Sequence, residues 1–323
     1  MTPPDFWIEG GPLARLLEPL GGLVALAGWL RRAATTPWRA PVPVFCVGNI
    51  TVGGAGKTPV ALWLGRFLAA EGRKPAYLSR GYGGSATGPL LVDPDSHDAD
   101  LVGDEPLLLA AVAPTWVGAD RVASAKAAVA AGADCLILDD GFQNPRLAKT
   151  VSLVVVDGAV GFGNGKVMPA GPCREPVRVG LARADAVVLI GTDAQNLAPR
   201  LAKRLPVFSA RIAPRADAQK FAGREVVAFA GIGRPEKFFA TLAALGAKVV
   251  RRIAFTDHHP YSQADIQPIL DEAYRRRAIP VTTEKDAMRL PPDQRQQVDV
   301  LAVEIAWDDP EPPQRLLRAA LGS

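Results

Sequence analysis

The sequence predicts an α/β protein with a mostly parallel sheet covered by helices on both faces, a second, smaller α/β domain and an N-terminal apolar helix. Short apolar segments alternate with helical segments from Val42 onward, and a second alternating set begins near Arg224. Several short segments are apolar throughout, as strands buried on both faces must be. With 323 residues, 48% hydrophobic and 22% charged, the chain has ample material for folded domains and too little charge for a disordered protein.

The N-terminal region, residues 1–35, is predicted to contain an apolar helix over residues 13–32. Its uncharged run, residues 20–30, holds eleven residues and is followed by two arginines. Because a bilayer-spanning helix needs about 20 apolar residues, we expect this run to be too short to cross a membrane. Acidic residues stand where a signal peptide has its basic segment. A membrane-associated interfacial helix and a core helix packed on the domain fit the segment equally well.

Residues 36–222 are predicted to form the core domain, with strands over 44–48, 76–79, 115–117, 135–138, 153–156, 186–190 and 207–210 and helices over 59–70 and 120–131. A smaller α/β domain is expected over residues 223–306, with strands over 226–230, 248–253, 280–282 and 300–303 and helices over 235–245 and 262–276. The remaining residues, 307–323, are expected to hold a proline-rich linker over 308–313 and a helix over 311–321 that returns to the core.

Composition narrows the function classes. The 37 basic and 33 acidic residues give a net charge of +4, which permits an anionic partner without requiring nucleic acid. The three cysteines, Cys46, Cys135 and Cys173, are far apart and never in a C-x-x-C spacing. Neither a disulfide framework nor a zinc site is therefore predicted, and a reducing, cytoplasmic setting follows.

A glycine-rich loop follows the first predicted strand and precedes a predicted helix, which is the context of a nucleotide-binding loop. Its glycines let backbone N–H groups turn toward phosphate oxygens, while Lys57 reaches the β and γ phosphates and the Thr58 hydroxyl ligates Mg²⁺. The alternative is a glycine-rich turn with a surface lysine. The expected nucleotide-binding residues are Thr51, Val52, Gly53, Gly54, Ala55, Gly56, Lys57 and Thr58.

Two adjacent carboxylates, Asp139 and Asp140, follow the apolar strand over residues 135–138. An open α/β sheet binds ligands at the carboxyl ends of its strands, and Mg²⁺ prefers hard oxygen ligands. We expect a Walker-B carboxylate here, with Asp139 nearest the metal. The alternative is that one of the two serves as a helix cap or turn residue.

Seven motifs then occur in one order: the loop segment 48–59, Ser-Arg-Gly-Tyr-Gly-Gly at 79–84, Gly-Asp-Glu-Pro at 103–106, Asp-Asp-Gly-Phe-Gln at 139–143, residues 168–176, Phe-Thr-Asp-His-His at 255–259 and Thr-Thr-Glu-Lys-Asp at 282–286. This set closely resembles the tetraacyldisaccharide 4′-kinase (lipid A 4′-kinase) family, from the N-terminal helix to about residue 290. The resemblance implies transfer of the ATP γ-phosphate to the 4′-hydroxyl of a tetraacylated glucosamine disaccharide 1-phosphate. It also implies a P-loop core and nucleotide held in a cleft between two domains.

The resemblance also implies roles for individual residues. Asp104 matches the catalytic base, His258 its partner and Lys57 the phosphate-binding lysine. Without the resemblance, Asp104 is read as a helix N-cap and His258 as a turn residue. The implied metal ligands are Thr58, Asp139, Asp140 and Glu175, and the implied substrate-binding residues are Asn49, Arg80, Gln143 and Arg174. Many relatives have His after the 139–143 motif, where this chain has Asn144.

ATP and Mg²⁺ are the expected cofactors, and the anionic lipid and the inner-membrane surface are the expected partners. No nucleic acid and no obligate protein partner are expected. The expected location is the cytoplasmic face of the inner membrane, with peripheral or monotopic attachment. Residues 141–183 carry a local charge of +4 from Arg146, Lys149, Lys166, Arg174, Arg178 and Arg183 against Asp157 and Glu175. Such a surface suits an acidic headgroup, and a solvated loop face is the alternative.

The main rival function is a P-loop switch ATPase or a metal-delivery GTPase. Many partitioning ATPases carry a signature lysine where this chain has Val52. The chain also lacks the guanine-reading N-K-x-D motif and a His/Cys-rich metal store. These observations favour the kinase.

Overall fold

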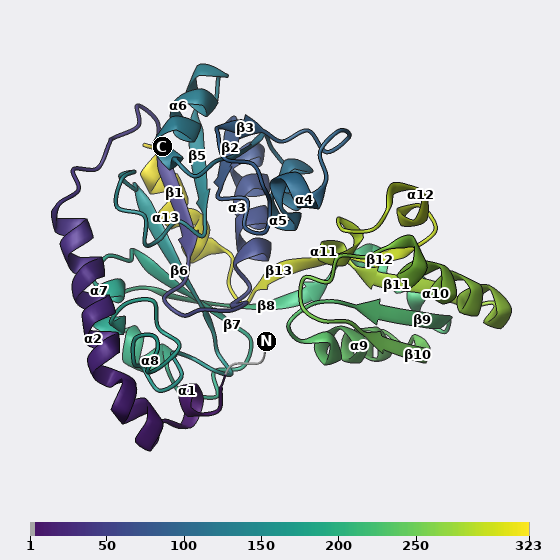
Figure 1. The fold of residues 1–323 in the computed structure, drawn as a ribbon. Helices are drawn as coiled ribbons and strands as arrows, with labels where there is room; N and C mark the ends of the chain where they lie inside the picture. Colours follow the sequence, from purple (N-terminus) through teal and green to yellow (C-terminus); the bar gives the residue numbers. More distant parts are fainter. Residues whose placement is uncertain (1–3, 323) are drawn as a thin grey trace.

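The computed structural model describes residues 4–322 and folds them into two β-sheets flanked by helices (Figure 1). The predicted regions 1–35 and 307–323 include residues 1–3 and 323, which lie outside the described residues. The strands are β1 Val44–Gly48, β2 Pro75–Ser79, β3 Leu90–Leu91, β4 Thr115–Val117, β5 Cys135–Asp139, β6 Val151–Asp157, β7 Ala186–Ile190, β8 Val207–Pro214, β9 Glu225–Ala230, β10 Lys248–Ala254, β11 Ile279–Thr283, β12 Asp299–Leu301 and β13 Val303–Trp307.

Most helices lie between successive strands, as the alternating sequence pattern predicts. They are α1 Phe6–Glu9, α2 Pro12–Ala33, α3 Lys57–Ala70, α4 Ala99–Val102, α5 Asp104–Ala110, α6 Arg121–Ala130, α7 Val177–Leu181, α8 Ala198–Leu201, η1 Ala216–Phe221 (a 3₁₀ helix), α9 Pro235–Ala244, α10 Gln263–Arg276, α11 Glu284–Ala287, α12 Pro292–Arg295 and α13 Glu311–Leu321. The expected elements up to residue 283 are confirmed, with ends that shift by four residues or fewer.

Within the described residues, the large sheet has the strand order β13-β8-β7-β6-β1-β5-β2-β4-β3. Neighbouring strands from β8 to β4 pair in parallel, and antiparallel pairs occur only at the two edges. Because β1 lies between β5 and β6, the carboxyl ends of β1 and β5 open into one crevice at the edge of the sheet. This is where open α/β sheets bind ligands.

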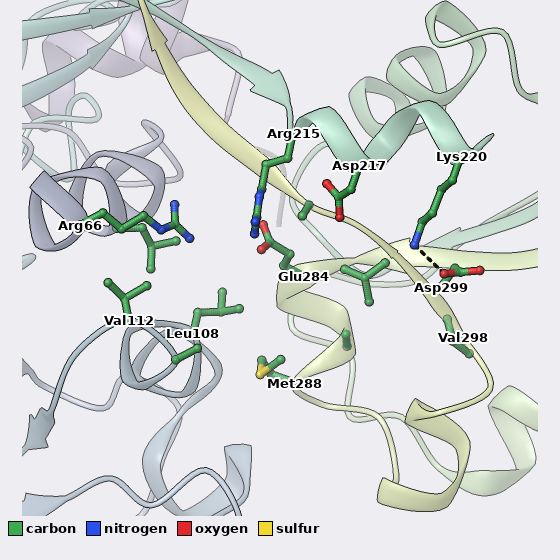
Figure 2. A pocket seen from close by; sticks show the side chains of 15 residues that line it. Arg66, Leu108, Val112, Arg215, Asp217, Lys220, Glu284, Met288, Val298 and Asp299 are labelled. Carbon is green, nitrogen blue, oxygen red and sulfur yellow. Dashed lines mark hydrogen bonds and ion pairs between the residues drawn. The ribbon is translucent and has the colours of Figure 1, made fainter. Parts of the chain in front are cut away.

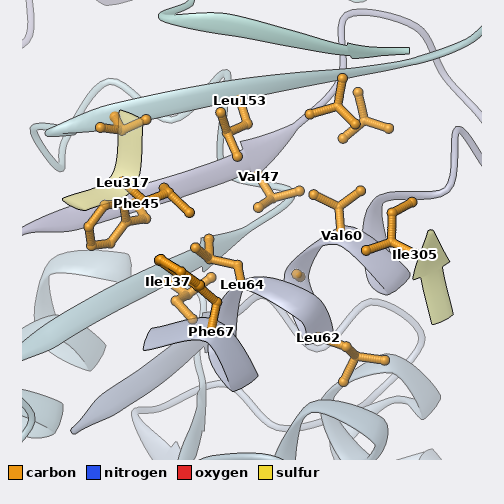
Figure 3. Close-up of a cluster of buried hydrophobic side chains, with 14 of the residues drawn as sticks. Phe45, Val47, Val60, Leu62, Leu64, Phe67, Ile137, Leu153, Ile305 and Leu317 are labelled. Atoms are coloured by element: carbon orange, nitrogen blue, oxygen red, sulfur yellow. The ribbon is translucent and has the colours of Figure 1, made fainter. Parts of the chain in front are cut away.

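Alternate residues of the central strands point to opposite faces of the large sheet and build two cores. On one face, Phe45 and Val47 of β1 pack against α3 and α13, as Figure 3 shows for Val60 and Leu317. On the opposite face, Cys46 belongs to a core that includes residues of α6, α7 and α8. Helices on both faces explain why the strands are apolar throughout.

The small sheet is parallel in the order β10-β9-β11-β12, with α9 packed on one face and α10 on the other. The chain reaches it after β8 and returns through β13, and these two strands pair antiparallel from Val303 with Pro214 to Trp307 with Ala210. Figure 1 shows them running from the large sheet toward the small one. The small sheet is therefore inserted between two strands of the large one.

The predicted single strand over residues 300–303 is wrong. The chain forms β12 in the small sheet and then, after the buried Ala302, β13 in the large sheet. The sequence is apolar across the point where the chain passes from one sheet to the other. The hydrophobic pattern therefore predicted one strand where β12 and β13 are separate. The predicted linker over 308–313 is also too long, because α13 already begins at Glu311.

Helix α2 is longer than the uncharged run on which the sequence argument rested. It has 22 residues and a mean hydropathy of 1.4 in its most apolar 18-residue window, of which 11% is buried. By length and composition it could cross a membrane, so the expectation that it is too short is wrong. The expectation counted only the uncharged run, whereas Arg15 and Glu18 extend the helix toward its N-terminus. Gly21 packs against the main chain near Val167, which ties the helix to the large unit.

Candidate functional site

The phosphate loop connects β1 to α3 at the crevice of the large sheet. Gly53 and Gly56 have φ angles of 102° and 84°, in the left-handed region that glycine adopts without strain. The Val52 N–H donates to the carbonyl of Pro172 over 2.8 Å, which holds the loop against the following segment. A Cβ atom at Gly53 would have nothing within 4 Å, so that point of the loop faces open space. Helix α3 begins at Lys57, and its free N–H groups make an anion-binding end.

Lys57 lies beside the second carboxylate of the Asp-Asp pair. Its Nζ is 3.6 Å from Oδ2 of Asp140. The Arg174 guanidinium binds the same carboxylate through two hydrogen bonds, Nη1 to Oδ1 at 2.9 Å and Nη2 to Oδ2 at 3.1 Å. Asp140 has a φ of 46°, which turns it away from the extended path of β5. The structure thus brings Lys57, Asp140 and Arg174 together.

Asp139, the last residue of β5, is 3% exposed, and its carboxylate makes no hydrogen bond or ion pair with any described residue. Burial, followed by the charges of Glu105 and Asp140, raises its pKa to about 7. A buried carboxylate without a protein partner is costly, and a bound cation would remove that cost.

Gln143 connects Arg174 to the buried Glu175. Its Nε2 donates to the Asn49 carbonyl at 2.9 Å and to Oε1 of Glu175 at 3.1 Å, and its Oε1 accepts from Arg174 at 3.4 Å. The other Glu175 oxygen accepts from Arg183 at 2.5 Å. Both Glu175 oxygens therefore already have protein partners. This favours a role for Glu175 in orienting neighbouring side chains over a role as a direct metal ligand.

Asn49 is fully buried beneath the phosphate loop, and its Nδ2 donates to the Gly53 carbonyl at 3.4 Å. This position supports the loop and offers no surface to a substrate. Arg80, in contrast, is exposed in the glycine-rich segment after β2. Its charge, second to burial, lowers the pKa of the buried Arg121 to about 10.

The predicted catalytic base, Asp104, and its predicted partner, His258, lie in contact although they come from different units. Asp104 is the first residue of α5 in the large unit and is 4% exposed, whereas His258 follows β10 of the small unit. Nδ1 of His258 is 3.2 Å from Oδ2 of Asp104. His258 has a φ of 58°, so a strained backbone presents the imidazole.

Two further cations, to which the sequence motifs assign no role, lie close to the Asp104 carboxylate. Lys285 Nζ lies 3.8 Å and Arg289 Nε 3.5 Å from the same Oδ2. Burial alone would raise the pKa of Asp104, but His258, Lys285 and Arg289 outweigh it and hold the pKa below its ordinary value. Lys285 is part of the quoted 282–286 motif, which was the available signal, while nothing in the sequence near Arg289 points to Asp104.

A cavity lies away from the phosphate loop. It has a volume of about 500 Å³ at the junction of the two units, and Figure 2 shows Arg66, Arg215 and Glu284 in its wall. Arg66 follows Lys57 by nine residues in α3, about 14 Å along the helix axis. This cavity is therefore separate from the phosphate loop.

A phosphate loop at the switch point of a parallel sheet, together with the contact between Asp104 and His258, defines a P-loop phosphotransferase. Residues 13–321 match the family model described as Tetraacyldisaccharide-1-P 4'-kinase, and the chain belongs to this family. It is 58% identical to the tetraacyldisaccharide 4'-kinase of Rhodospirillum rubrum, covering 96% of this chain and 95% of that one. It is 54% identical to the enzyme of the same name from Rhodospirillum centenum, covering 99% and 97%.

The fold agrees with a solved relative. A crystal structure of LpxK from Aquifex aeolicus in complex with ATP superposes with a TM-score of 0.79 at 28% identity, covering 96% of this chain and 100% of that chain. These matches do not favour the rival interpretation as a switch ATPase or metal-delivery GTPase.

Proposed function

We propose that this protein transfers the γ-phosphate of ATP to the 4′-hydroxyl of tetraacyldisaccharide 1-phosphate, giving lipid IVA in lipid A biosynthesis. The observation that carries this proposal is the buried Asp104, whose carboxylate lies within 3.8 Å of His258, Lys285 and Arg289. A sugar hydroxyl is a poor nucleophile, and a positioned carboxylate is the group that accepts its proton.

Asp104 stays ionised at neutral pH because neighbouring cations outweigh its burial, so it is ready to take a proton. His258 orients the carboxylate from the opposite unit, and bringing the two units together completes the base. Lys57, at the N-terminus of α3, neutralises developing charge on the transferred phosphoryl group. Arg174 fixes the Asp140 carboxylate, and Gln143 fixes the start of the phosphate loop through the Asn49 carbonyl. Asn49 supports the phosphate loop, and Arg80 and Arg174 bind the substrate.

The residues present fit Mg²⁺. Asp139 is a buried carboxylate without a protein partner, and the Thr58 hydroxyl stands in the first turn of α3. No group of three or more His, Cys, Asp or Glu side chains gathers to hold a metal among residues 4–322. Mg²⁺ commonly takes only one or two protein carboxylates and completes its shell with phosphates and water. Thr58 and Asp139 would hold the ion, and bound Mg²⁺ would neutralise charge on the phosphates. The oxygens of Asp140 and Glu175 are already bound by Arg174 and by Gln143 and Arg183, so these two carboxylates would orient the cations beside the ion.

The exposed face of α2 supports a place at the inner-membrane surface, on its cytoplasmic side. Leu16, Leu23 and Trp29 are 74%, 62% and 56% exposed, which is unusual for such side chains in a soluble core helix. Arg31 and Arg32 end the helix at a position suited to lipid headgroups. A peripheral or monotopic attachment would place the acceptor lipid near the phosphate loop.

We also propose two domains, predicted over 36–222 and 223–306, with ATP held between them; the smaller one ends before β13, which pairs with β8 in the large sheet. The two parts are in contact, because Arg234 of the smaller one lies 2.7 Å from Asp157 of the core.

The test is a kinase assay with the purified protein, ATP, Mg²⁺ and tetraacyldisaccharide 1-phosphate in detergent micelles. We expect lipid-dependent ADP release and a bisphosphorylated lipid product. Lys57→Met should abolish both, while Lys248→Met, on an exposed strand of the small sheet, should retain them. ATP hydrolysis that is independent of the lipid would favour the switch ATPase and contradict the proposal.

A further inference from the structure

A second cavity, of about 420 Å³, lies where α2 ends and the chain turns toward β1. Its wall comes from three separate segments: the end of α2 with the residues after it, the connection from β5 to β6, and the residues between α7 and β7. Three cations face it, Arg32, Lys149 and Arg183, against one lining carboxylate, Asp185. We call this cavity the second anion pocket.

The two arginines of the second anion pocket are partly neutralised. Arg183 donates to the Glu175 carboxylate at 2.5 Å, and Arg32 lies 3.5 Å from the same oxygen. The lining carboxylate is also engaged, because Oδ2 of Asp185 accepts from the Ser152 N–H at 2.7 Å. One carboxylate thus serves two guanidinium groups, which leaves an excess of positive charge.

Lys149 is the one cation of the second anion pocket that has no carboxylate partner among the described residues. Its Nζ donates to the carbonyl oxygens of Asn144 at 2.5 Å and Leu147 at 3.5 Å, and it forms no ion pair with any described residue. Burial, together with the Arg183 charge, lowers the pKa of Lys149. A half-buried ammonium without a counterion is costly, and an anion entering the cavity would remove that cost.

We propose that the second anion pocket binds the phosphate ester of a lipid, with Lys149 as the central cation and Arg32 and Arg183 at its sides. The chemistry is that of a phosphate ester on an anionic lipid at the membrane surface. Two sources supply it: the phosphate that the acceptor already carries, or the headgroup of a neighbouring phospholipid. The first source rests on the proposed function.

The pocket is joined to the phosphate loop by a continuous set of contacts. Arg183 and Arg32 contact Glu175, Glu175 accepts from Gln143, and Gln143 accepts from Arg174. Arg174 in turn binds Asp140 beside Lys57. An acceptor with a hydroxyl at one end and a phosphate at the other would place its two ends at the two ends of this set. The pocket would then select acceptors that already bear a phosphate.

The experiment compares Lys149→Met, Lys149→Arg and Arg146→Gln. Arg146 lies in the same connection, is 65% exposed and pairs with Asp120, so its replacement removes an equal charge outside the pocket. In the first arm, KM is measured for the acceptor with and without its 1-phosphate. In the second, binding of ATP-free protein to phosphatidylglycerol vesicles is compared with binding to phosphatidylcholine vesicles. The melting temperature of each variant is recorded alongside.

We expect Lys149→Met to weaken binding of the phosphate ester about tenfold or more, the effect of losing one charge-assisted hydrogen bond. A KM that rises only for the phosphorylated acceptor assigns the pocket to the substrate. A loss of phosphatidylglycerol binding with unchanged KM assigns it to the bilayer lipid. Lys149→Arg should keep most of the binding, because it retains the positive charge. Arg146→Gln should change neither KM nor vesicle binding, and the melting temperature of Lys149→Met should not fall.

Three results would overturn the proposal. The first is no change in either arm. The second is an equal rise in KM for acceptors with and without the phosphate. The third is a fall in melting temperature that accounts for the loss, which would make Lys149 a structural clamp on the Asn144 and Leu147 carbonyls. If the wild-type protein phosphorylates no lipid, the proposed function fails, and the vesicle arm alone decides whether the pocket binds phosphate.

Discussion

The Asp104 carboxylate and the His258 imidazole lie 3.2 Å apart although one belongs to the large unit and the other to the small unit. Asp104 is buried, whereas the His258 side chain is 40% exposed. The pair therefore depends on how the two units sit against each other, and not on either unit alone.

Replacing the base tests its role directly. Asp104→Asn keeps the shape of the side chain and the acceptor for the Glu105 N–H but cannot take a proton from the sugar hydroxyl. We expect kcat to fall by about 10²- to 10⁴-fold, the usual contribution of a general base, with ATP affinity changed little. Steady-state kinetics and nucleotide binding measure the two effects separately. An unchanged kcat would remove Asp104 from the mechanism.

Lys285 should tune that base. Its charge helps to hold the pKa of Asp104 low, so Lys285→Met should raise this pKa and move the acidic limb of the kcat/KM profile to higher pH. We expect the loss of activity to be greatest at low pH, where a larger share of Asp104 is protonated. Lys248→Met, at an exposed position of β10, is the control. A profile that falls evenly at all pH values would argue for a purely structural role.

Asp139 should make the metal-free protein less stable as pH rises. Because its pKa is raised to about 7, the folded protein keeps a proton that the unfolded chain releases above about pH 4. The free energy of unfolding should therefore fall between about pH 4 and 7, with a slope of at most about 1.4 kcal/mol per pH unit from this group. Thermal unfolding with EDTA across this range should show a flatter dependence for Asp139→Asn. Identical slopes in both proteins would contradict the assigned pKa.

Neighbouring glycines in α2 should respond oppositely to alanine. A Cβ at Gly21 would lie 2.6 Å from the main-chain oxygen of Val167, whereas one at Gly22 would meet nothing within 4 Å. Gly22→Ala should stabilise the helix by up to about 1 kcal/mol. Gly21→Ala should destabilise its docking by about 1–3 kcal/mol, as overpacking does. Protease sensitivity of the N-terminal segment and the melting temperature measure both, and equal responses would show that α2 is not held at this point.

The exposed face of α2 should govern membrane association. Deleting residues 1–32 should move the protein toward the soluble fraction, and Leu23→Glu with Leu26→Glu should do so in the intact chain, because a charged residue is costly in the hydrocarbon region. Matched changes at polar positions, Arg15→Gln and Glu18→Gln, serve as controls. Fractionation of cells expressing each variant provides the measurement. Undiminished association of the deletion would place the anchor elsewhere.

Local patterns predicted most strands of the large sheet because each is an apolar run between turn residues. The phosphate loop was equally clear, since Gly53, Gly56 and Lys57 carry their chemistry within one short segment. Short helices such as α4 and α11 escaped because four residues show no periodicity. The surroundings of Asp104 escaped for another reason: Lys285 and Arg289 reach it only after the small unit packs against α5.

The same limit applies to charge. Six basic residues between 141 and 183 give a local excess of positive charge, but their number does not show which of them pair with carboxylates. In the folded chain Arg174 serves Asp140, Arg183 serves Glu175 and Lys149 faces a cavity without a counterion. Only the tertiary contacts distinguish the cations that pair with a carboxylate, such as Arg174 and Arg183, from Lys149.

The return of the chain through β13 and α13 sets an order of events during synthesis. Ile305 and Leu317 are buried in the core around β1 and α3, yet they follow the whole small unit in the sequence. Domains fold largely as they emerge from the ribosome, N-terminal parts first. The core of the large unit therefore stays incomplete, and β8 remains an edge strand unpaired on one side, until the inserted sheet, β13 and α13 have been translated. A truncation shortly before residue 303 would leave that edge permanently uncovered, which makes such fragments candidates for chaperone capture or aggregation.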